Sequence, residues 1–552
     1  MSSSQSQKVV VIGGGPVGAL AALYAARRGY QTELYELRDD PNHGDPSLRP
    51  DFAVIPLALS QRGIEAIEEA GVSGLLEGIL ENSRDIFTRM IHTENSKGEP
   101  ELIPMVYGPN GECLHTLQRE KVTQHCLMAL EKEPTAKLFF NHKTVSIDLD
   151  NKKLKFENVV WRERHRIAEQ QIVDDINKPM PIAKPSEEVN NNHKAPVHKS
   201  GDAKPDETQI KEVKYDFLIG ADGTYSSVRQ TLMRKMEIDF HQTYVQAHWC
   251  DFIIPSAKNG DYPMDSRCLH VWPADKSIVM AQPDFNNTFR AGMVCDTEQI
   301  RHFEAHPEQF ADWFRKEFKG IVPDLMSAEE ATAQFVKHQK IPLKSIKLNK
   351  FGYKDDVVLL GDSSHTMTPF HAMGMITGLE DVRVFFKRFR DPAAAAVAAN
   401  RPTAKKGPTP FCPAGTIAAY TAHRMPDVNA MVDLAHEHYG ELRHGVRSPV
   451  QRARKIFDAA VRRHLPFTGW NTLYARIQFG TERMSEVVQK ERKQTNIVKG
   501  MLSSTGMLVG GVAYACVNLL LSQQSQAAGG ASGILEGAFQ NGTAASAAIG
   551  AA

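Results

Sequence analysis

Val9-Val-Val-Ile-Gly-Gly-Gly-Pro-Val-Gly18 is the stretch that decides the fold. An apolar run precedes three glycines in G-x-G-x-x-G spacing, an alanine-rich segment follows, and an acid, Glu36, ends the next strand-like run. In such a strand–turn–helix unit, Gly13 permits the tight turn, Gly15 lets the backbone approach a pyrophosphate, and Gly18 lets the helix pack close to the sheet. Glu36 lies at the usual distance to accept hydrogen bonds from ribose hydroxyls. The stretch therefore predicts a dinucleotide site, and an ordinary glycine-rich turn is the alternative.

A second signature lies far downstream, in Leu359-Leu-Gly-Asp-Ser-Ser-His365 followed by Pro369. A short strand should end here, and a helix should begin near Gly374. Asp362 can then accept hydrogen bonds from ribityl hydroxyls, while the helix N-terminus faces the electron-rich carbonyl edge of a flavin. A plain helix N-cap is the alternative role for this aspartate.

A third signature, Asp222–Gly223, closes a strand over residues 215–219, and Arg229 follows a little further on. Its simpler interpretation is an Asp-Gly turn. FAD is a long molecule that must be held at both ends, so the first two signatures together predict FAD, and the third supports them.

Composition narrows the class of protein. The 552 residues contain 65 basic and 65 acidic side chains, which gives no net charge and argues against a nucleic-acid partner. The seven cysteines form no C-x-x-C pair, so neither a metal site nor a redox dithiol is predicted. No secretory signal is visible, and we expect a reducing compartment.

The predicted fold class is α/β: a Rossmann-like FAD domain with a mixed β-sheet substrate domain and a C-terminal helical region. A hairpin is expected over residues 145–156 and an amphipathic helix over residues 60–82. The predicted divisions are FAD-binding segments at 1–160, 214–235 and 346–390, a substrate sheet domain at 236–345, a C-terminal helical region at 413–499, a disordered insertion at 161–213, a linker at 391–412, a possible membrane anchor at 500–522, and a disordered tail at 523–552.

The anchor prediction depends on residues 500–521, which contain no charged side chain and are long enough to span a bilayer. The basic stretch at 490–499 fits a cytoplasmic flank. A buried core helix rich in glycine and alanine is the alternative.

Several segments resemble the kynurenine 3-monooxygenase family, which lies within the FAD-dependent aromatic hydroxylases of the para-hydroxybenzoate hydroxylase type. They are Arg89-Met-Ile-His92, Asn141-His-Lys143, Lys258-Asn-Gly-Asp-Tyr262, Leu269-His-Val-Trp-Pro273 and Met425-Pro-Asp427. The resemblance runs from about Lys8 to about Lys499. It implies bound FAD, NADPH as transient reductant, O2 as co-substrate, and an aromatic amino-acid substrate such as L-kynurenine. It also implies the cytoplasmic face of the mitochondrial outer membrane, with a cytoplasmic protein as the alternative, and it leaves the oligomeric state open.

The resemblance also implies the site, in which no side chain acts as nucleophile or base. The implied substrate contacts are Arg89, Tyr107, Tyr474 and His438. The implied cofactor contacts are Gly13, Gly15, Val17, Gly18, Tyr35, Glu36, Leu37, Arg38, Ala58, Arg119, Asp222, Ser227, Asp362, Gly374, Met375 and Ile376. An arginine fork and phenol hydroxyls suit a carboxylate. A surface salt bridge and ordinary core packing are the alternative roles for these side chains.

The chain departs from the family at several positions. Met373 stands in place of a glutamine and Ile376 of an asparagine, both beside where the flavin ring should lie, and His371 enters the same loop. Ala53 stands in place of an arginine before Leu57, and His438 in place of an asparagine near the substrate carboxylate. Each lost hydrogen bond removes about 1 kcal/mol. These changes leave two further hypotheses open: a hydroxylase of another aromatic carboxylate, and a non-catalytic membrane-associated paralogue.

Overall fold

The structure is a computed structural model, and it describes residues 7–43, 57–81, 83–95, 97–108, 111–159, 210–389, 411–443 and 449–504. Its contacts divide the chain into two compact units. The first comprises residues 1–447 and 474–485, and the second comprises 448–473 and 486–552. Each unit is described by itself.

A six-stranded sheet forms the core of the first unit, in the order β18-β19-β12-β1-β2-β8. All neighbours pair in parallel except β18 and β19. The strands are β1 (Lys8–Ile12), β2 (Gln31–Tyr35), β8 (Ala136–Phe139), β12 (Phe217–Gly220), β18 (Gly352–Tyr353) and β19 (Val357–Leu359). Residues 9–12 are buried throughout, as expected for a parallel strand covered on both faces. The predicted α/β class with a Rossmann-like domain is confirmed.

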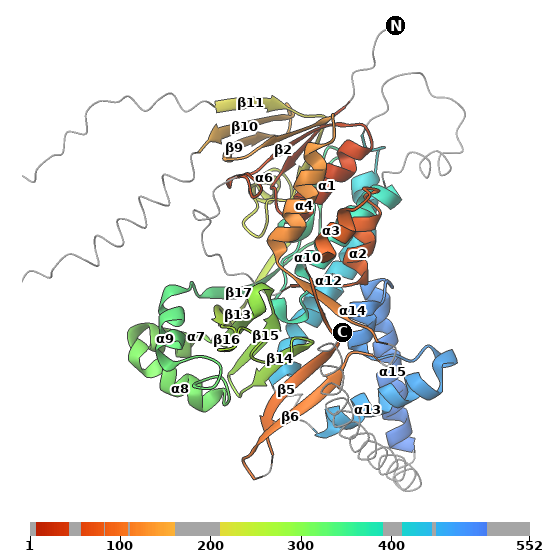
Figure 1. Cartoon of the computed structure of the whole chain (residues 1–552). Coiled ribbons are helices and arrows are strands. Elements are labelled where there is room, and N and C mark those ends of the chain that lie inside the picture. Colours follow the sequence, from red (N-terminus) through yellow and green to blue (C-terminus); the bar gives the residue numbers. More distant parts are fainter. Residues whose placement is uncertain are drawn as a thin grey trace, which may run out of the picture. The chain divides into compact units, whose positions relative to one another are not determined.

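Four helices lie around this sheet, visible in the upper half of Figure 1. They are α1 (Pro16–Arg27), α4 (Arg119–Glu131), α10 (Gly374–Val384) and α2 (Gln61–Glu68). Helix α1 is buried along almost its whole length, because its alanines allow close approach to the sheet and to α4 and α10. The predicted single helix over residues 60–82 is wrong. Gly71 and Gly74 take positive φ between α2 and α3 (Leu75–Glu81) and divide it into two.

The predicted hairpin at 145–156 is confirmed as β9 (His142–Asp148) and β10 (Lys153–Asn158). A third antiparallel strand, β11 (Ile210–Lys214), adds to its free edge. The predicted insertion at 161–213 therefore ends too late, because 210–213 already pair with β10; residues 161–209 lie outside the described residues. The predicted linker at 391–412 also ends too late, since Phe411 and Cys412 are buried and the Phe411 ring contacts Phe217.

The second large sheet has seven strands, in the order β17-β13-β16-β15-β14-β5-β6. Its strands are β5 (Thr88–Glu94), β6 (Pro100–Val106), β13 (Phe240–Ile254), β14 (Cys268–Pro273), β15 (Ser277–Pro283), β16 (Phe289–Asp296) and β17 (Ile341–Leu348). The helices α7 (Thr297–Ala305), α8 (Phe310–Glu317) and α9 (Ala328–Lys337) pack on it through a phenylalanine-rich core. The predicted substrate domain at 236–345 is thus incomplete, because β5 and β6 come from the segment assigned to FAD binding and join this sheet through β14.

A third, small sheet is antiparallel, with the strand order β3-β7-β4. It contains β3 (Leu57–Leu59), β4 (Arg84–Ile86) and β7 (Leu114–Leu117). Its inward side chains, including Ile86 and Leu114, form a cluster with Ala58 and Tyr107.

The C-terminal region is helical, as predicted. Helix α12 (Thr416–Arg443) and residues 474–485 belong to the first unit, and α14 (Leu473–Phe479) is almost wholly within it. The second unit contains α13 (Pro449–His464) and most of α15 (Met484–Ser504). Within the part of the chain that the structure describes, no helix is both long enough and apolar enough to span a bilayer. Residues 505–552, with most of the predicted anchor and all of the tail, lie outside it.

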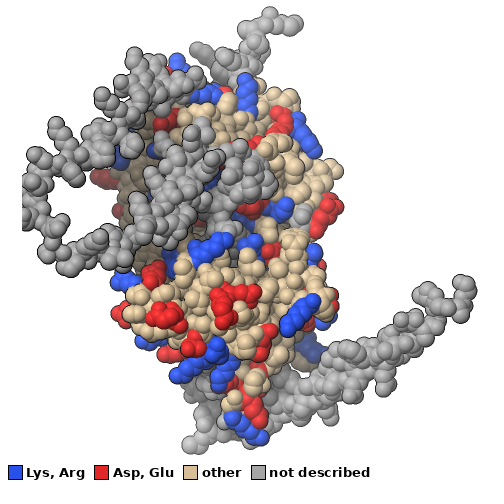
Figure 2. All heavy atoms as spheres, turned by 60° about the vertical axis from the view of Figure 1, so that its left-hand side comes forward, with Lys and Arg blue, Asp and Glu red and all other residues tan. Residues whose placement is uncertain are grey.

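On the face in Figure 2, acidic and basic side chains are interspersed.

Candidate active site

The first glycine signature forms the turn between β1 and α1, and two of its glycines admit no side chain. Gly13 has φ of 103°, and a Cβ there would lie 2.3 Å from the carbonyl oxygen of Ala221. A Cβ on Gly18 would lie 1.9 Å from the carbonyl oxygen of Gly13. These close approaches bring the strand ends β1 and β12 against the start of α1.

Gly15 differs, because its Cβ position faces open space bounded by the Arg119 guanidinium, 3.7 Å away. The N-terminus of α1 has no side-chain cap, so its first N–H groups remain available to an anion. A helix N-terminus with an arginine opposite fits the pyrophosphate of FAD. Glu36, the predicted ribose acceptor, accepts hydrogen bonds from the backbone N–H groups of Gly14 and Arg38 and so lies on this loop.

The second signature packs directly against the first. Residues Gly361–Ser363 form a 3-10 turn after β19. A Cβ on Gly361 would lie 3.1 Å from Val17 Cγ2, and one on Gly378 would lie 2.6 Å from the same atom. The two glycines therefore leave room for the side chain of Val17. Val17 is a predicted cofactor residue of the first signature, and it packs here against the second signature.

The third signature connects to the second through Arg229. Asp222 Oδ2 accepts hydrogen bonds from the N–H and the hydroxyl of Ser227, at 2.7 and 2.8 Å, and so caps α6 (Ser227–Lys235). Arg229 is buried and donates to the carbonyl oxygens of Thr224 and Ser363. Asp222 Oδ1 is buried without a hydrogen-bond partner, and so can accept from a ligand.

Asp362 lies in the turn of the second signature, and its Oδ2 accepts from the Thr224 hydroxyl at 3.2 Å. Met373, not Asp362, is the N-cap residue of α10, so the N-cap alternative for this aspartate is wrong. Helix α10 begins at Gly374 as predicted, and its N-cap makes no side-chain hydrogen bond. The N–H groups of its first turn, which include that of Met375, can therefore face an electron-rich ligand edge.

Sequence reasoning missed the buried ionic network that holds the second signature in place. Asp381, on α10, accepts from the N–H of Gly361 at 2.9 Å, from His365 Nε2 at 2.6 Å and from Arg424 Nε at 2.7 Å. Burial raises the pKa of the Asp381 carboxyl, His365 and Arg424 lower it, and the net change is a lowering. Glu380 accepts from Arg424 at 2.7 Å and from Arg62 at 2.8 Å. The sequence signal is the pair of adjacent acids, Glu380 and Asp381, in a helix whose other residues are mostly apolar.

Two departures from the family pattern have side chains that face the protein interior. Met373 and Ile376 are fully buried. A Cβ on Gly63 would lie 2.8 Å from Ile376 Cδ1, so the isoleucine packs against α2. These two side chains therefore pack inside the protein, and the groups of α10 that can face a flavin are the backbone N–H groups of its first turn. Ala53 lies outside the described residues.

Some of the predicted cofactor residues at the end of β2 face the protein interior and others face solvent. The Tyr35 ring is buried and stacks on Phe156 with centroids 3.9 Å apart, while its carbonyl accepts from the N–H of Gly13. Its side chain therefore stabilises the domain and does not face the glycine loop. Leu37 is 38% exposed, and Arg38 lies beside it on the surface.

Three of the predicted substrate residues converge in one buried place. Arg89 stands on β5 and is 6% exposed, and its guanidinium carbon lies 4.9 Å from the centre of the Tyr474 ring. The rings of Tyr107 and Tyr474 stack with centroids 5.4 Å apart. Arg89 Nε and the Tyr107 hydroxyl are buried without hydrogen-bond partners, and no described carboxylate forms an ion pair with Arg89. Ala58, from β3, packs against Tyr107 in the same cluster.

A stacked histidine pair borders this cluster. The rings of His371 and His438 lie 4.0 Å apart, and the Tyr474 ring centre lies 6.3 Å from His371 and 6.4 Å from His438. Burial and the neighbouring His438 hold the pKa of His371 well below its usual value, so this imidazole is neutral. His438 Nδ1 contacts Glu441 at 2.9 Å, whereas His436, two residues earlier, is exposed. His438 therefore joins the predicted substrate residues in space.

Comparison with known proteins shows which family the chain resembles. Residues 6–391 match the family described as FAD binding domain. Proteins named kynurenine 3-monooxygenase from Neosartorya fischeri and Aspergillus fumigatus are 33% identical over 92% of this chain and 92% of their own length. The protein of that name from Chaetomium globosum is 35% identical over 90% of this chain and 97% of its own.

Solved structures of low identity share the fold. The tetrameric form of 2-methyl-3-hydroxypyridine-5-carboxylic acid oxygenase is 14% identical, with a TM-score of 0.54 over 83% of this chain and 96% of that one. P. aeruginosa PqsL in complex with 2-aminobenzoylacetate is 17% identical, with a TM-score of 0.54 over 80% and 98%.

The chain belongs to the kynurenine 3-monooxygenase family, and it is an FAD-dependent monooxygenase. The resemblance seen in its motifs is confirmed. Membership in an enzyme family also argues against the non-catalytic hypothesis.

Proposed function

We propose that this monooxygenase hydroxylates L-kynurenine to 3-hydroxykynurenine, with NADPH as reductant and O2 as co-substrate. One observation carries the proposal: Arg89 is a buried cation without an ion-pair partner among the described residues. An unpaired buried charge is costly, so the pocket has a strong preference for an anion at that place. The α-carboxylate of an aromatic amino acid supplies it, and the names of the relatives indicate which amino acid.

The chain's own residues bind and orient this substrate. The Arg89 fork and the unpartnered Tyr107 hydroxyl receive the carboxylate, while the Tyr474 ring stacks on the arginine guanidinium. Neutral His371 presents a buried Nδ1 without a partner, which can hydrogen-bond a polar group of the substrate. FAD, when bound, supplies the oxygen chemistry with electrons from NADPH. The aniline amine of kynurenine activates its ortho ring carbon, so no nucleophile or base is required from the protein.

The test is Arg89→Ala in the FAD-loaded protein, measured by kynurenine-dependent NADPH oxidation and product analysis. A charged hydrogen bond contributes about 1.5–3 kcal/mol, so KM for kynurenine should rise about 10- to 150-fold while FAD content stays unchanged. Arg267→Ala, at an arginine 75% exposed, is the matched control and should leave KM unchanged. An unchanged KM in the Arg89 variant would refute the carboxylate site.

A second candidate is a hydroxylase of another aromatic carboxylate, favoured by the His371–His438 pair, which can recognise a polar group that kynurenine lacks. Under this alternative, FAD remains bound and Arg89 remains essential, but another aromatic acid stimulates NADPH oxidation more strongly than kynurenine does.

We also propose that residues 500–521 attach the protein to the cytoplasmic face of the mitochondrial outer membrane. The support is the uncharged stretch itself and the basic residues before it. Deleting residues 500–552 should move the protein from the membrane fraction to the supernatant with its FAD retained. Continued sedimentation with membranes would contradict the anchor.

A further inference from the structure

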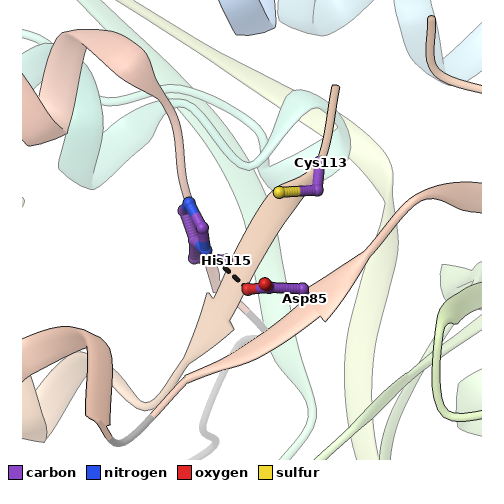
Figure 3. A group of neighbouring side chains, drawn as sticks. All are labelled: Asp85, Cys113 and His115. Atoms are coloured by element: carbon purple, nitrogen blue, oxygen red, sulfur yellow. Dashed lines mark hydrogen bonds and ion pairs between the residues drawn. The ribbon is translucent and has the colours of Figure 1, made fainter. Parts of the chain in front are cut away.

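Three side chains with metal-ligand chemistry meet on the solvent face of the small β3-β7-β4 sheet. They are Asp85 on β4, Cys113 directly before β7, and His115 on β7. Their ligand atoms lie within 4.8 Å of one another. Figure 3 shows the three side chains pointing toward one another from the two adjacent strands.

Strand geometry explains why they meet. Alternate residues of a strand share a face, so Cys113 and His115 project to the same side. The register places Asp85 opposite His115. The residue between the two ligands, Leu114, points the other way and is buried with Tyr107. The cluster therefore requires correct pairing of β4 and β7, which no spacing in the sequence reveals.

From this arrangement we infer that Asp85, Cys113 and His115 form a binding site for a divalent transition metal of the zinc class, with water in the fourth position. The inference does not depend on the identity of the aromatic substrate.

The donor set selects the class of ion. A thiolate with an imidazole suits Zn²⁺ and disfavours Mg²⁺ and Ca²⁺, which prefer oxygen ligands. Three protein ligands with an open position are typical of a zinc site that also holds water. Asp85 is 49% exposed and His115 23% exposed, so an ion has access from solvent.

The distances require only small side-chain movements. Ligands at about 2.0–2.3 Å from zinc in a tetrahedron stand about 3.3–3.8 Å apart. Asp85 Oδ1 and His115 Nδ1 are now 2.6 Å apart, so binding a metal ion between them requires the two atoms to move further apart by less than about 1 Å. Because the thiolate is the form of cysteine that binds a metal, zinc binding also releases the thiol proton of Cys113.

A second group of neighbouring side chains also has metal-ligand chemistry, but it is more exposed and has no thiolate. Asp40, His43 and Glu131 also bring their ligand atoms within 4.8 Å. His43 is 70% exposed, however, and the group has no sulfur ligand. It serves as an internal control for weak surface binding.

The experiment is equilibrium dialysis of chelator-treated, FAD-loaded full-length protein against buffered free Zn²⁺, with bound zinc measured by atomic emission. Wild type and His43→Gln should bind about one equivalent with the same dissociation constant. Cys113→Ser and His115→Gln should each weaken binding by more than the about 10- to 100-fold that second-shell changes cost. Zinc K-edge absorption of the wild type should show one sulfur neighbour at about 2.3 Å, lost in Cys113→Ser.

Equal zinc affinity in Cys113→Ser and wild type would overturn the site, as would a shell of oxygen and nitrogen only or no binding at micromolar free zinc. Loss of zinc in His43→Gln alone would assign the metal to the other group and also overturn it. Unchanged FAD content in all variants shows that they are folded.

Discussion

Asp381→Asn tests whether the buried network on α10 holds the second FAD signature. The substitution keeps the size of the side chain and removes its charge, so two charge-assisted contacts weaken at once: 2.7 Å to Arg424 and 2.6 Å to His365. Each such bond contributes about 1.5–3 kcal/mol. Arg424 keeps Glu380 at 2.7 Å, so the loss should fall at the low end of the about 3–5 kcal/mol typical of a broken buried pair. We expect about 3 kcal/mol.

The assay is urea unfolding of the FAD-loaded protein, followed by flavin fluorescence, together with titration of FAD into the apoprotein. Asp433→Asn is the matched control, because Asp433 pairs with Lys347 on the surface and is 60% exposed. Exposed pairs contribute about 0–1 kcal/mol, so this variant should remain close to wild type. A difference below about 0.5 kcal/mol between the two variants, with equal FAD affinity, would refute the proposed role of the network.

The pH dependence of this difference has a defined sign. The pKa of Asp381 is lower in the folded protein than in the unfolded chain. Its stabilising contribution is therefore present above the unfolded pKa of about 3.9 and is lost as the pH falls through the folded value. The gap between wild type and Asp381→Asn should be largest at neutral pH and should shrink below about pH 4.

Three further predictions concern packing, proton linkage and the third signature. Gly378→Ala places a methyl group 2.6 Å from Val17 Cγ2, so we expect about 1–3 kcal/mol of destabilisation by thermal melting; an unchanged melting temperature would contradict the close packing. Burial, with the neighbouring His270, lowers the pKa of His92 to about 3, so only the unfolded chain takes up the proton between pH 6.5 and 5.5. Wild type should lose about 1 kcal/mol of stability across that range, and His92→Phe should lose less; equal slopes would refute the linkage. Arg229→Lys cannot donate to two carbonyl oxygens from a rigid fork, so gel filtration should show faster FAD loss than from wild type, and equal retention would contradict its role.

The local motifs were predictable because their chemistry is contained in a few adjacent residues. Gly13 and Gly18 admit no Cβ, and this constraint is visible in the sequence as the G-x-G-x-x-G spacing of glycines directly after an apolar run. The start of α10 at Gly374 and the hairpin over residues 145–156 follow from equally local signals. The family resemblance supplied the rest of the substrate site, since nothing in the sequence around Arg89 distinguishes a buried anion site from a surface pair.

Long-range pairing was not predictable from the same signals. Strands β5 and β6 join the substrate sheet only through β14, about 180 residues away along the chain, and no local pattern specifies that partner. The ionic network around Asp381 and the cluster at His115 likewise arise from tertiary contacts. The packing of Ile376 depends on tertiary contacts in the same way, because the structure turns this side chain toward α2 and nothing in the loop sequence specifies that neighbour.

The most direct test of the central claim is the absorbance spectrum of the purified protein, followed by NADPH oxidation with and without L-kynurenine. The account predicts bound FAD, oxidation stimulated by kynurenine, and 3-hydroxykynurenine as product. Bound FAD with no response to kynurenine, or with hydroxylation of a different aromatic acid, would contradict the proposed substrate. Failure to bind FAD even when it is added in excess would contradict the account of the cofactor site itself.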